Sequence, residues 1–282
     1  MTTPFDAPDW RSLDQEALDR GLNNSAAVAG SGDLVEGWGK LSADIRARHH
    51  RHLNLQYGPR ERNRIDFLKT QTPNAPTLLF IHGGYWQMRA KEFFTLFAAG
   101  PMAHGINVAL IGYTLAPDAT LDQIVAEIHA GIDFLARQLI DLGADASRIV
   151  ASGWSAGGHL TAMAMMNPRI KGGVAISGIY DLEPIRHSYL NIKLGLDEAM
   201  SRRNSPMASA EGPMKPLSLV VGGAELPLLR KQTADFAGHR ARHGLPVAYE
   251  EIPGANHFTI MDEMAQPSGR ITAMIRQVVE RV

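Results

Sequence analysis

Residues 147–157 decide the expected fold: the apolar run Ser147-Arg148-Ile149-Val150-Ala151-Ser152 leads directly into Gly153-Trp154-Ser155-Ala156-Gly157. A Gly-x-Ser-x-Gly pentapeptide between a buried strand and a helix predicts a sharp turn that lifts the serine hydroxyl above a sheet. The flanking glycines suit such a turn, because there is no room for a Cβ atom on either side of the serine. Since the pentapeptide also occurs by chance, the rest of the chain has to agree with it.

Continuous apolar runs predict strands that are buried on both faces of a sheet. They cover residues 77–81, 108–111, 149–151, 174–176 and 219–221, with a weaker last strand at 247–252. Helical patterns separate these runs; the clearest begins at Thr120, with Gln123 at the spacing of a capping box. Other helices are expected at 159–166, 227–243 and 268–279. Alternation of this kind predicts the α/β class, with a mostly parallel central sheet and helices on both faces.

The chain divides into an expected helical N-terminal extension, residues 1–50, and one α/β domain, residues 51–282. In the extension, Ser12 and Asp33 have the spacing of helix N-caps. The alternating segments 53–57 and 64–68 predict an antiparallel pair at a sheet edge. No insertion is long enough for a large cap domain. The extension is expected to form either a partial lid or a subunit contact, the latter in a homodimer.

Composition limits the classes of function. The 282 residues are 45% hydrophobic and 20% charged, with a net charge of −1, which is ordinary for a soluble globular protein and gives no basic surface for nucleic acid. The absence of cysteine excludes disulfides, thiolate nucleophiles and Cys-ligated zinc. The start of the sequence resembles no signal peptide and no apolar run is long enough for a membrane span, so a cytoplasmic protein without membrane partners is expected.

A glycine pair follows the strand expected at 77–81, in His82-Gly83-Gly84-Tyr85-Trp86. Adjacent glycines let backbone N–H groups approach a substrate oxygen, so Gly83 and Gly84, together with the N–H of Ala156, are candidate oxyanion donors. A plain Gly-Gly turn is the alternative interpretation. His82 precedes the serine turn in the chain, and we expect its side chain to hydrogen-bond the loop rather than to move protons.

The candidate base and acid follow the last two expected strands. His257, just beyond residues 247–252, stands where a base is expected in the chain order serine, acid, histidine. Glu225 follows the strand at 219–221, whereas Asp181 follows the preceding one and competes for the same role. We favour Glu225 and expect Asp181 to order its own loop. His159, His239 and His243 fit packing or solvated positions on helices.

Neither a metal nor an organic cofactor is expected. His49, His50 and His52 lie on a short polar segment and do not converge on one ion. Gly222-Gly223 is no dinucleotide fingerprint, because no G-x-G-x-x-G follows the first parallel strand. The expected partner is therefore a small amide or ester substrate alone.

These segments together resemble the α/β-hydrolase superfamily, and more narrowly the kynurenine formamidase (arylformamidase) group and its relatives among the H-G-G esterases. The residues that carry the resemblance are 82–86, 113–117, 155–160, 177–182, 222–225, 230–233 and 256–258. The resemblance implies Ser155 as nucleophile, Glu225 as acid and His257 as base. The chain departs from that group at Glu225, where the formamidases commonly have Asp, and at the bulky Trp154 beside the serine.

The expected chemistry is acyl transfer through a covalent serine intermediate, with Glu225 holding the imidazole of His257. Tyr85, Trp86 and Trp154 are expected to line the mouth and to stack against an aromatic leaving group. With the resemblance, this favours an N-formyl or short N-acyl arylamine as substrate. The alternatives are a short-chain carboxylesterase or thioesterase with the same triad and, more remotely, a non-catalytic receptor for small molecules.

Overall fold

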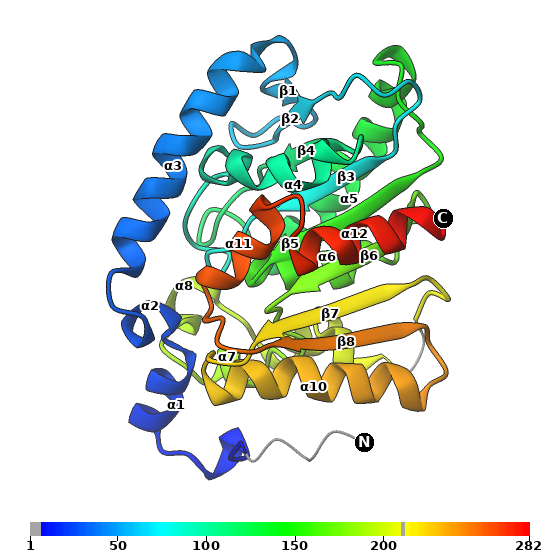
Figure 1. Cartoon of the computed structure of the whole chain (residues 1–282). Coiled ribbons are helices and arrows are strands. Elements are labelled where there is room, and N and C mark those ends of the chain that lie inside the picture. The colour runs from blue at the N-terminus through cyan, green and yellow to red at the C-terminus, as the bar shows by residue number, and fades with distance from the viewer. Residues whose placement is uncertain (1–6, 210–211) are drawn as a thin grey trace.

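A mostly parallel sheet of eight strands crosses the part of the chain that the computed structural model describes, residues 7–209 and 212–282 (Figure 1). The first six residues of the expected extension lie outside that description. The strand order is β1-β2-β4-β3-β5-β6-β7-β8. The strands are β1 Leu55–Gln56, β2 Arg64–Leu68, β3 Thr77–Ile81, β4 Asn107–Ile111, β5 Ile149–Trp154, β6 Ile170–Ile176, β7 Leu217–Gly222 and β8 Val247–Ile252.

The predicted arrangement of strands is confirmed. β1 pairs antiparallel with β2 and β2 antiparallel with β4, whereas all pairs from β4 to β8 are parallel. Successive side chains of a strand point to opposite faces, so a strand covered on both faces is apolar throughout. In β3, Leu79 and Ile81 belong to one hydrophobic cluster, and Leu78 and Phe80 to the other.

Helices cover both faces of the sheet. On one face α5 Leu121–Asp141, α6 Ala156–Ala164 and α10 Pro227–Arg242 pack against the strands; on the other face lie α4 Ala99–Ala103, α11 Asp262–Ala265 and α12 Arg270–Glu280. The shorter helices are α7 Glu183–Arg186, α8 Asn191–Leu194 and α9 Glu198–Arg203. The 3₁₀ helices of the described residues lie at Trp10–Ser12, His50–His52, Lys91–Ala98, Pro206–Ala208 and Thr259–Met261. No helix of the described residues is both long and apolar enough to cross a bilayer.

The N-terminal extension forms α1 Gln15–Leu22, α2 Asn24–Ala27 and α3 Ser31–Arg48. Figure 1 shows these helices along the side toward which the arrows of β7 and β8 point, which is the side of the carboxyl ends of the parallel strands. Helix α3 packs mainly against the 3₁₀ segment Lys91–Ala98. Because ligands of such sheets bind at the carboxyl ends of the strands, the extension lies next to the expected site.

The helix starts agree with the sequence at Thr120 and Pro227, and they differ for the helices predicted to begin at Ser12, Asp33, 159 and 268, the last of which begins at Arg270. Thr120 and Gln123 form the predicted capping box of α5. The caps predicted at Ser12 and Asp33 are wrong: Asp14 caps α1 by accepting from the N–H of Ala17, and α3 begins two residues before Asp33. A first-turn acid such as Asp33 still stabilises a helix through the dipole, so the pattern alone did not distinguish the two positions. Helix α6 begins at Ala156, not at 159, because the serine turn leads straight into it.

A buried carboxylate joins the extension to the sheet. Asp66 of β2 has a fully buried side chain and accepts hydrogen bonds from the Nζ atom of Lys91 at 2.9 Å and the N–H of Asn54 at 2.7 Å. Arg46 of α3 pairs with the same carboxylate. Buried charges are tolerated when they are paired and hydrogen-bonded, so this cluster ties α3 and the start of the 3₁₀ segment at Lys91 to β2.

The substitution Asp66→Asn should lower the free energy of unfolding by about 3–5 kcal/mol, because it leaves Lys91 and Arg46 without their shared buried anion. Asp133→Asn is the matched control. Asp133 pairs with Arg169 at 3.2 Å, and both side chains are about half exposed, so a loss of about 1 kcal/mol or less is expected. Urea unfolding of the three proteins measures both values, and equal losses would contradict the role given to Asp66.

Candidate active site

The serine turn has the geometry that the sequence predicts. Ser155 stands between β5 and α6 with φ 59° and ψ −119°, a backbone conformation that is uncommon for residues other than glycine. A Cβ atom on Gly157 would lie 2.0 Å from the carbonyl oxygen of Ile81, and one on Gly153 would lie 2.3 Å from that of Gly157. Close backbone approach thus requires glycine at both positions and brings the turn against the end of β3.

Glu225 and His257 form a buried pair. The Oε2 atom of Glu225 accepts a hydrogen bond of 2.7 Å from Nδ1 of His257, and the two side chains are 0% and 5% exposed. The other oxygen, Oε1, accepts from the hydroxyl of Ser177 at 2.5 Å and from the N–H of Gly222 at 2.7 Å. These donors hold the carboxylate in one orientation, so the imidazole presents its Nε2 side away from the acid.

Asp181 lies elsewhere. Its carboxylate accepts from the N–H of Glu183 at the start of α7, and its backbone exchanges hydrogen bonds with the side chain of Gln232. Burial raises the pKa of Asp181 above its ordinary value. The structure therefore places Glu225 against His257, and it places Asp181 in the loop that this residue was expected to order.

Ser155 and His257 line the same pocket, whose volume is about 490 Å³. Five segments contribute to its lining: residues 23–25 of the extension, the loop 84–89, the serine turn at 154–155, residues 189–193 and the loop at 257–258. The Ser155 hydroxyl makes no hydrogen bond within the described residues. Contacts between a nucleophile and its base are often long until a substrate is bound, so this geometry is compatible with proton transfer between them.

The candidate oxyanion donors lie beside Ser155. A Cβ atom on Gly83 would lie 3.1 Å from Cβ of Ser155, so the backbone of the glycine loop passes directly over the serine. Ala156 is the first residue of α6, where N–H groups have no partner inside the helix. Among the hydrogen bonds of the described chain, none uses the N–H of Gly83, Gly84 or Ala156. All three are free to bind a substrate oxygen.

The three aromatic residues expected at the mouth have different positions. Tyr85 and Trp154 line the pocket, although Tyr85 also donates its hydroxyl to the carbonyl of Leu22 at 2.5 Å. The indole N–H of Trp154 donates to the carbonyl of His257 at 2.7 Å, which ties the serine turn to the histidine loop. The prediction for Trp86 is wrong. Its side chain is fully buried and packs edge-on against His159, because the loop turns through left-handed backbone at both Tyr85 and Trp86.

Sequence reasoning missed Ser177, which orients Glu225, and the polar residues Asn24, Arg89 and Lys193 of the pocket. Ser177 directly follows a predicted strand. This position indicates a role for its hydroxyl only once Glu225 is known to lie beside it. Asn24 donates from Nδ2 to the hydroxyl of Tyr85 at 3.0 Å, and so joins the extension to the glycine loop. That contact spans 61 residues of sequence and left no local pattern.

Two other histidines are structural, as expected. His82 donates from Nδ1 to the carbonyl of Gly83 and stacks on Tyr113, and His159 donates from Nε2 to the carbonyl of Asn204. Burial lowers the pKa of each imidazole to about 4. Both are therefore neutral at ordinary pH. Within residues 7–209 and 212–282, no three His, Asp or Glu side chains converge on a position for a metal ion.

Comparisons with known proteins identify relatives over most of the chain. A family model described as BD-FAE matches residues 65–178. The chain is 32% identical over 246 residues to a kynurenine formamidase of Salmo salar, covering 80% of this chain and 81% of that protein. It is 26% identical over 292 residues to the kynurenine formamidase of Danio rerio, covering 96% and 98%.

Solved structures share the fold. A crystal structure from Silicibacter sp. TM1040, provisionally named a thioesterase, superposes with a TM-score of 0.85 at 27% identity, over 92% of this chain and 98% of that one. An esterase of Pyrobaculum calidifontis has a TM-score of 0.69 at 17% identity, over 89% and 92%, and shares the fold. Fold and site together define an α/β-hydrolase. Within that class the chain belongs to the kynurenine formamidase family, and it is a hydrolase.

The buried histidines predict how stability depends on pH. Below pH 6.5 the unfolded chain protonates His82 and His159, whereas in the folded chain they stay neutral down to about 4. The unfolded state binds more protons in this window, so the free energy of unfolding is fully retained above pH 6.5 and falls toward pH 4. Each histidine contributes a slope of up to about 1.4 kcal/mol per pH unit.

Urea unfolding at closely spaced pH values measures this slope. His159→Gln should reduce the slope by up to about 1.4 kcal/mol per pH unit, which corresponds to one proton. This change is independent of the effect of the substitution on stability at neutral pH. His243→Gln, in the exposed turn after α10, is the control and should keep the wild-type slope. A His159→Gln slope equal to that of the wild type would contradict the assignment.

Proposed function

We propose that this chain removes a formyl or other short acyl group from an N-acyl arylamine, through a covalent intermediate on Ser155. The observation that carries the proposal is the buried pair in which Glu225 holds Nδ1 of His257 at 2.7 Å, at a pocket that also contains Ser155. A carboxylate on Nδ1 selects the tautomer whose Nε2 can accept a proton. Nucleophile, acid and base would then occur along the chain in the order Ser155, Glu225 and His257.

In the first step the Oγ atom of Ser155 attacks the acyl carbon while Nε2 of His257 takes the hydroxyl proton. The carbonyl oxygen becomes an oxyanion in a tetrahedral intermediate. The free N–H groups of Gly83, Gly84 and Ala156 support binding of that oxyanion, because they are fixed by the loop and by the start of α6. Comparable donors each contribute about 3 kcal/mol to the stability of the transition state.

In the second step the C–N bond breaks, and the imidazolium of His257 gives its proton to the departing amine. The product left on the enzyme is an ester of Ser155. Water then attacks this ester with His257 again as base, which releases formate or another short acid and restores the hydroxyl. Glu225 stabilises the imidazolium, a role supported by the hydrogen bonds that its carboxylate accepts from Ser177 and Gly222.

The pocket favours an aromatic amine as the leaving part. Tyr85, Trp154 and Phe258 line it with rings, and Tyr189 adds another at the rim. Residues 23–25 close one side, so we extend the proposal to the N-terminal extension as a partial lid. Its support is the hydrogen-bonded chain from Asn24 to the Tyr85 hydroxyl and on to the carbonyl of Leu22.

A short-chain carboxylesterase or thioesterase is the second candidate. It would use the same three residues, and the observation that favours it is the TM-score of 0.85 to the Silicibacter protein provisionally named a thioesterase. The two candidates differ in the bond that the pocket positions for attack, an amide with a poor leaving group or an activated ester.

A paired assay of the wild type and Ser155→Ala on N-formylkynurenine and p-nitrophenyl acetate separates the candidates. We expect kcat/KM for the formamide to exceed that for the ester, and Ser155→Ala to lower both by about 1,000-fold or more, because the nucleophile is removed. Release of formate and of nitrophenolate provides the readout.

Ester turnover alone, lost in Ser155→Ala, would replace the formamidase proposal with the second candidate. Formamide turnover that survives in Ser155→Ala would contradict the covalent mechanism. No turnover of either compound by the wild type would overturn the proposed function.

A further inference from the structure

The charges at the active-site pocket are all of one sign. Among the described residues that line it, Arg89 and Lys193 carry positive charges and no aspartate or glutamate is present. Arg89 is half-buried in the loop between β3 and the 3₁₀ segment, whereas Lys193 is exposed on α8. A pocket of this kind attracts an anionic ligand and repels a cationic one.

The side chain of Arg89 has no hydrogen-bond or ion-pair partner among the described residues. Its guanidinium takes part in no hydrogen bond or ion pair among residues 7–209 and 212–282, and Glu36, exposed on α3, acts on it only at longer range. Arg62 differs: it donates from Nε to the carbonyl of Tyr113 and from Nη2 to the carbonyl of Arg89 itself. Arg62 thus fixes the backbone of Arg89 but leaves the Arg89 side chain available.

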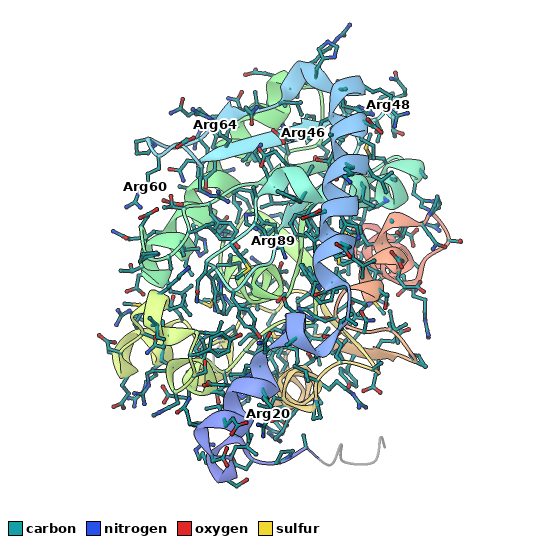
Figure 2. All side chains as sticks on the ribbon, turned by 90° about the vertical axis from the view of Figure 1, so that its left-hand side faces the viewer. Arg20, Arg46, Arg48, Arg60, Arg64 and Arg89 are labelled. Atoms are coloured by element: carbon teal, nitrogen blue, oxygen red, sulfur yellow. The ribbon has the colours of Figure 1, made fainter. Side chains whose placement is uncertain are left out.

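The loop holds this available side chain close to the reacting groups. A Cβ atom on Gly84 would lie 3.0 Å from Cγ of Arg89, so the arginine stem passes over one of the candidate oxyanion glycines. Arg89 has a left-handed backbone, φ 76°, in a loop where Tyr85 and Trp86 have one too. Figure 2 looks onto the side of the molecule along which α3 runs, and Arg89 lies near its centre, beside that helix.

Partial burial lowers the pKa of Arg89 below its ordinary value, although the group stays charged. An unpaired cation that has lost part of its hydration gains most from a bound anion. The planar guanidinium can hold a carboxylate through two parallel hydrogen bonds, which a lysine cannot.

We propose that Arg89 binds a carboxylate on the amine part of the substrate, and that it is the residue through which this hydrolase recognises that group. The inference rests on the proposed function at one point: a formyl group has no substituent, so the carboxylate belongs to the amine part. Lys193 at the rim adds attraction at longer range. Arg89 is then a specificity-determining residue, which acts on binding and leaves the chemistry to Ser155, His257 and Glu225.

Matched substrates test this selectivity. Formanilide and the three isomeric formamidobenzoates differ by one carboxylate, and phenyl acetate and the three acetoxybenzoates form the parallel ester series. Arg89→Met should lower the ratio of kcat/KM for the best carboxylated isomer to kcat/KM for its neutral partner by about 10- to 100-fold. The change should lie mainly in KM, because a charge-assisted hydrogen bond to the substrate is lost. Arg89→Lys should retain part of the preference, since it keeps the charge but not the planar fork.

Arg48→Met is the control: it removes the same charge from the exposed end of α3, far from Arg89 in Figure 2, and should keep the wild-type ratio. In each protein, kcat/KM for the charged substrate is divided by kcat/KM for its neutral partner. Comparing this ratio between proteins cancels the intrinsic reactivity of the substrates and any general loss of folded protein. Calorimetric titration measures the affinity for the same compounds in Ser155→Ala and in the double variant Ser155→Ala/Arg89→Met. The ratio of the affinities for charged and neutral partners is then available even where turnover is slow.

A wild type that prefers the neutral compounds would overturn the inference. An equal effect of Arg89→Met on charged and neutral partners would overturn it too, because a merely structural role predicts that result. If only esters are cleaved, but with a carboxylate preference that depends on Arg89, the anion site stands and the formamidase proposal alone falls.

Discussion

The backbone contact between the serine turn and β3 is the constraint on which the rest of the site depends. Gly157 lies so close to the carbonyl of Ile81 that a Cβ atom would be only 2.0 Å away. This approach forces a residue with a side chain, Ser155, into the left-handed region, and it brings the loop after β3 over the serine. One packing contact therefore positions both Ser155 and the glycine loop, which would supply the proposed nucleophile and oxyanion donors.

The parallel sheet supplies the remaining groups. Ser177, Glu225 and His257 follow β6, β7 and β8, so their side chains meet at the carboxyl edge of neighbouring strands. The donors around Glu225 make its burial tolerable, because a carboxylate with several hydrogen bonds is stabilised in its charged form. The extension reaches the same edge from residues remote in sequence. Asn24 joins the extension to the glycine loop, and Arg46 joins it to β2 through Asp66, which also binds Lys91.

The sequence predicted the strands, the edge pair, the serine turn and the capping box of α5, because each depends on local periodicity or on one sharp backbone requirement. It placed Trp86 wrongly, since two successive left-handed residues change the direction of side chains in a way that composition does not reveal. Chain order alone left Asp181 as an alternative to Glu225 for the role of the acid. The hydrogen bonds of the two side chains distinguish them, because only Glu225 contacts His257. The roles of Asn24 and Arg89 depend on contacts between distant segments, which a single sequence does not contain.

Covalent labelling with a fluorophosphonate, followed by peptide mass spectrometry, tests the central claim most directly: that Ser155 is a nucleophile activated by the His257–Glu225 pair. The account predicts one adduct, on Ser155, formed at least about 100-fold more slowly in Glu225→Gln, because the imidazole loses its orienting acid. Asp181→Asn should react at the wild-type rate. An adduct on another residue, or equal slowing by Asp181→Asn and Glu225→Gln, would contradict the account.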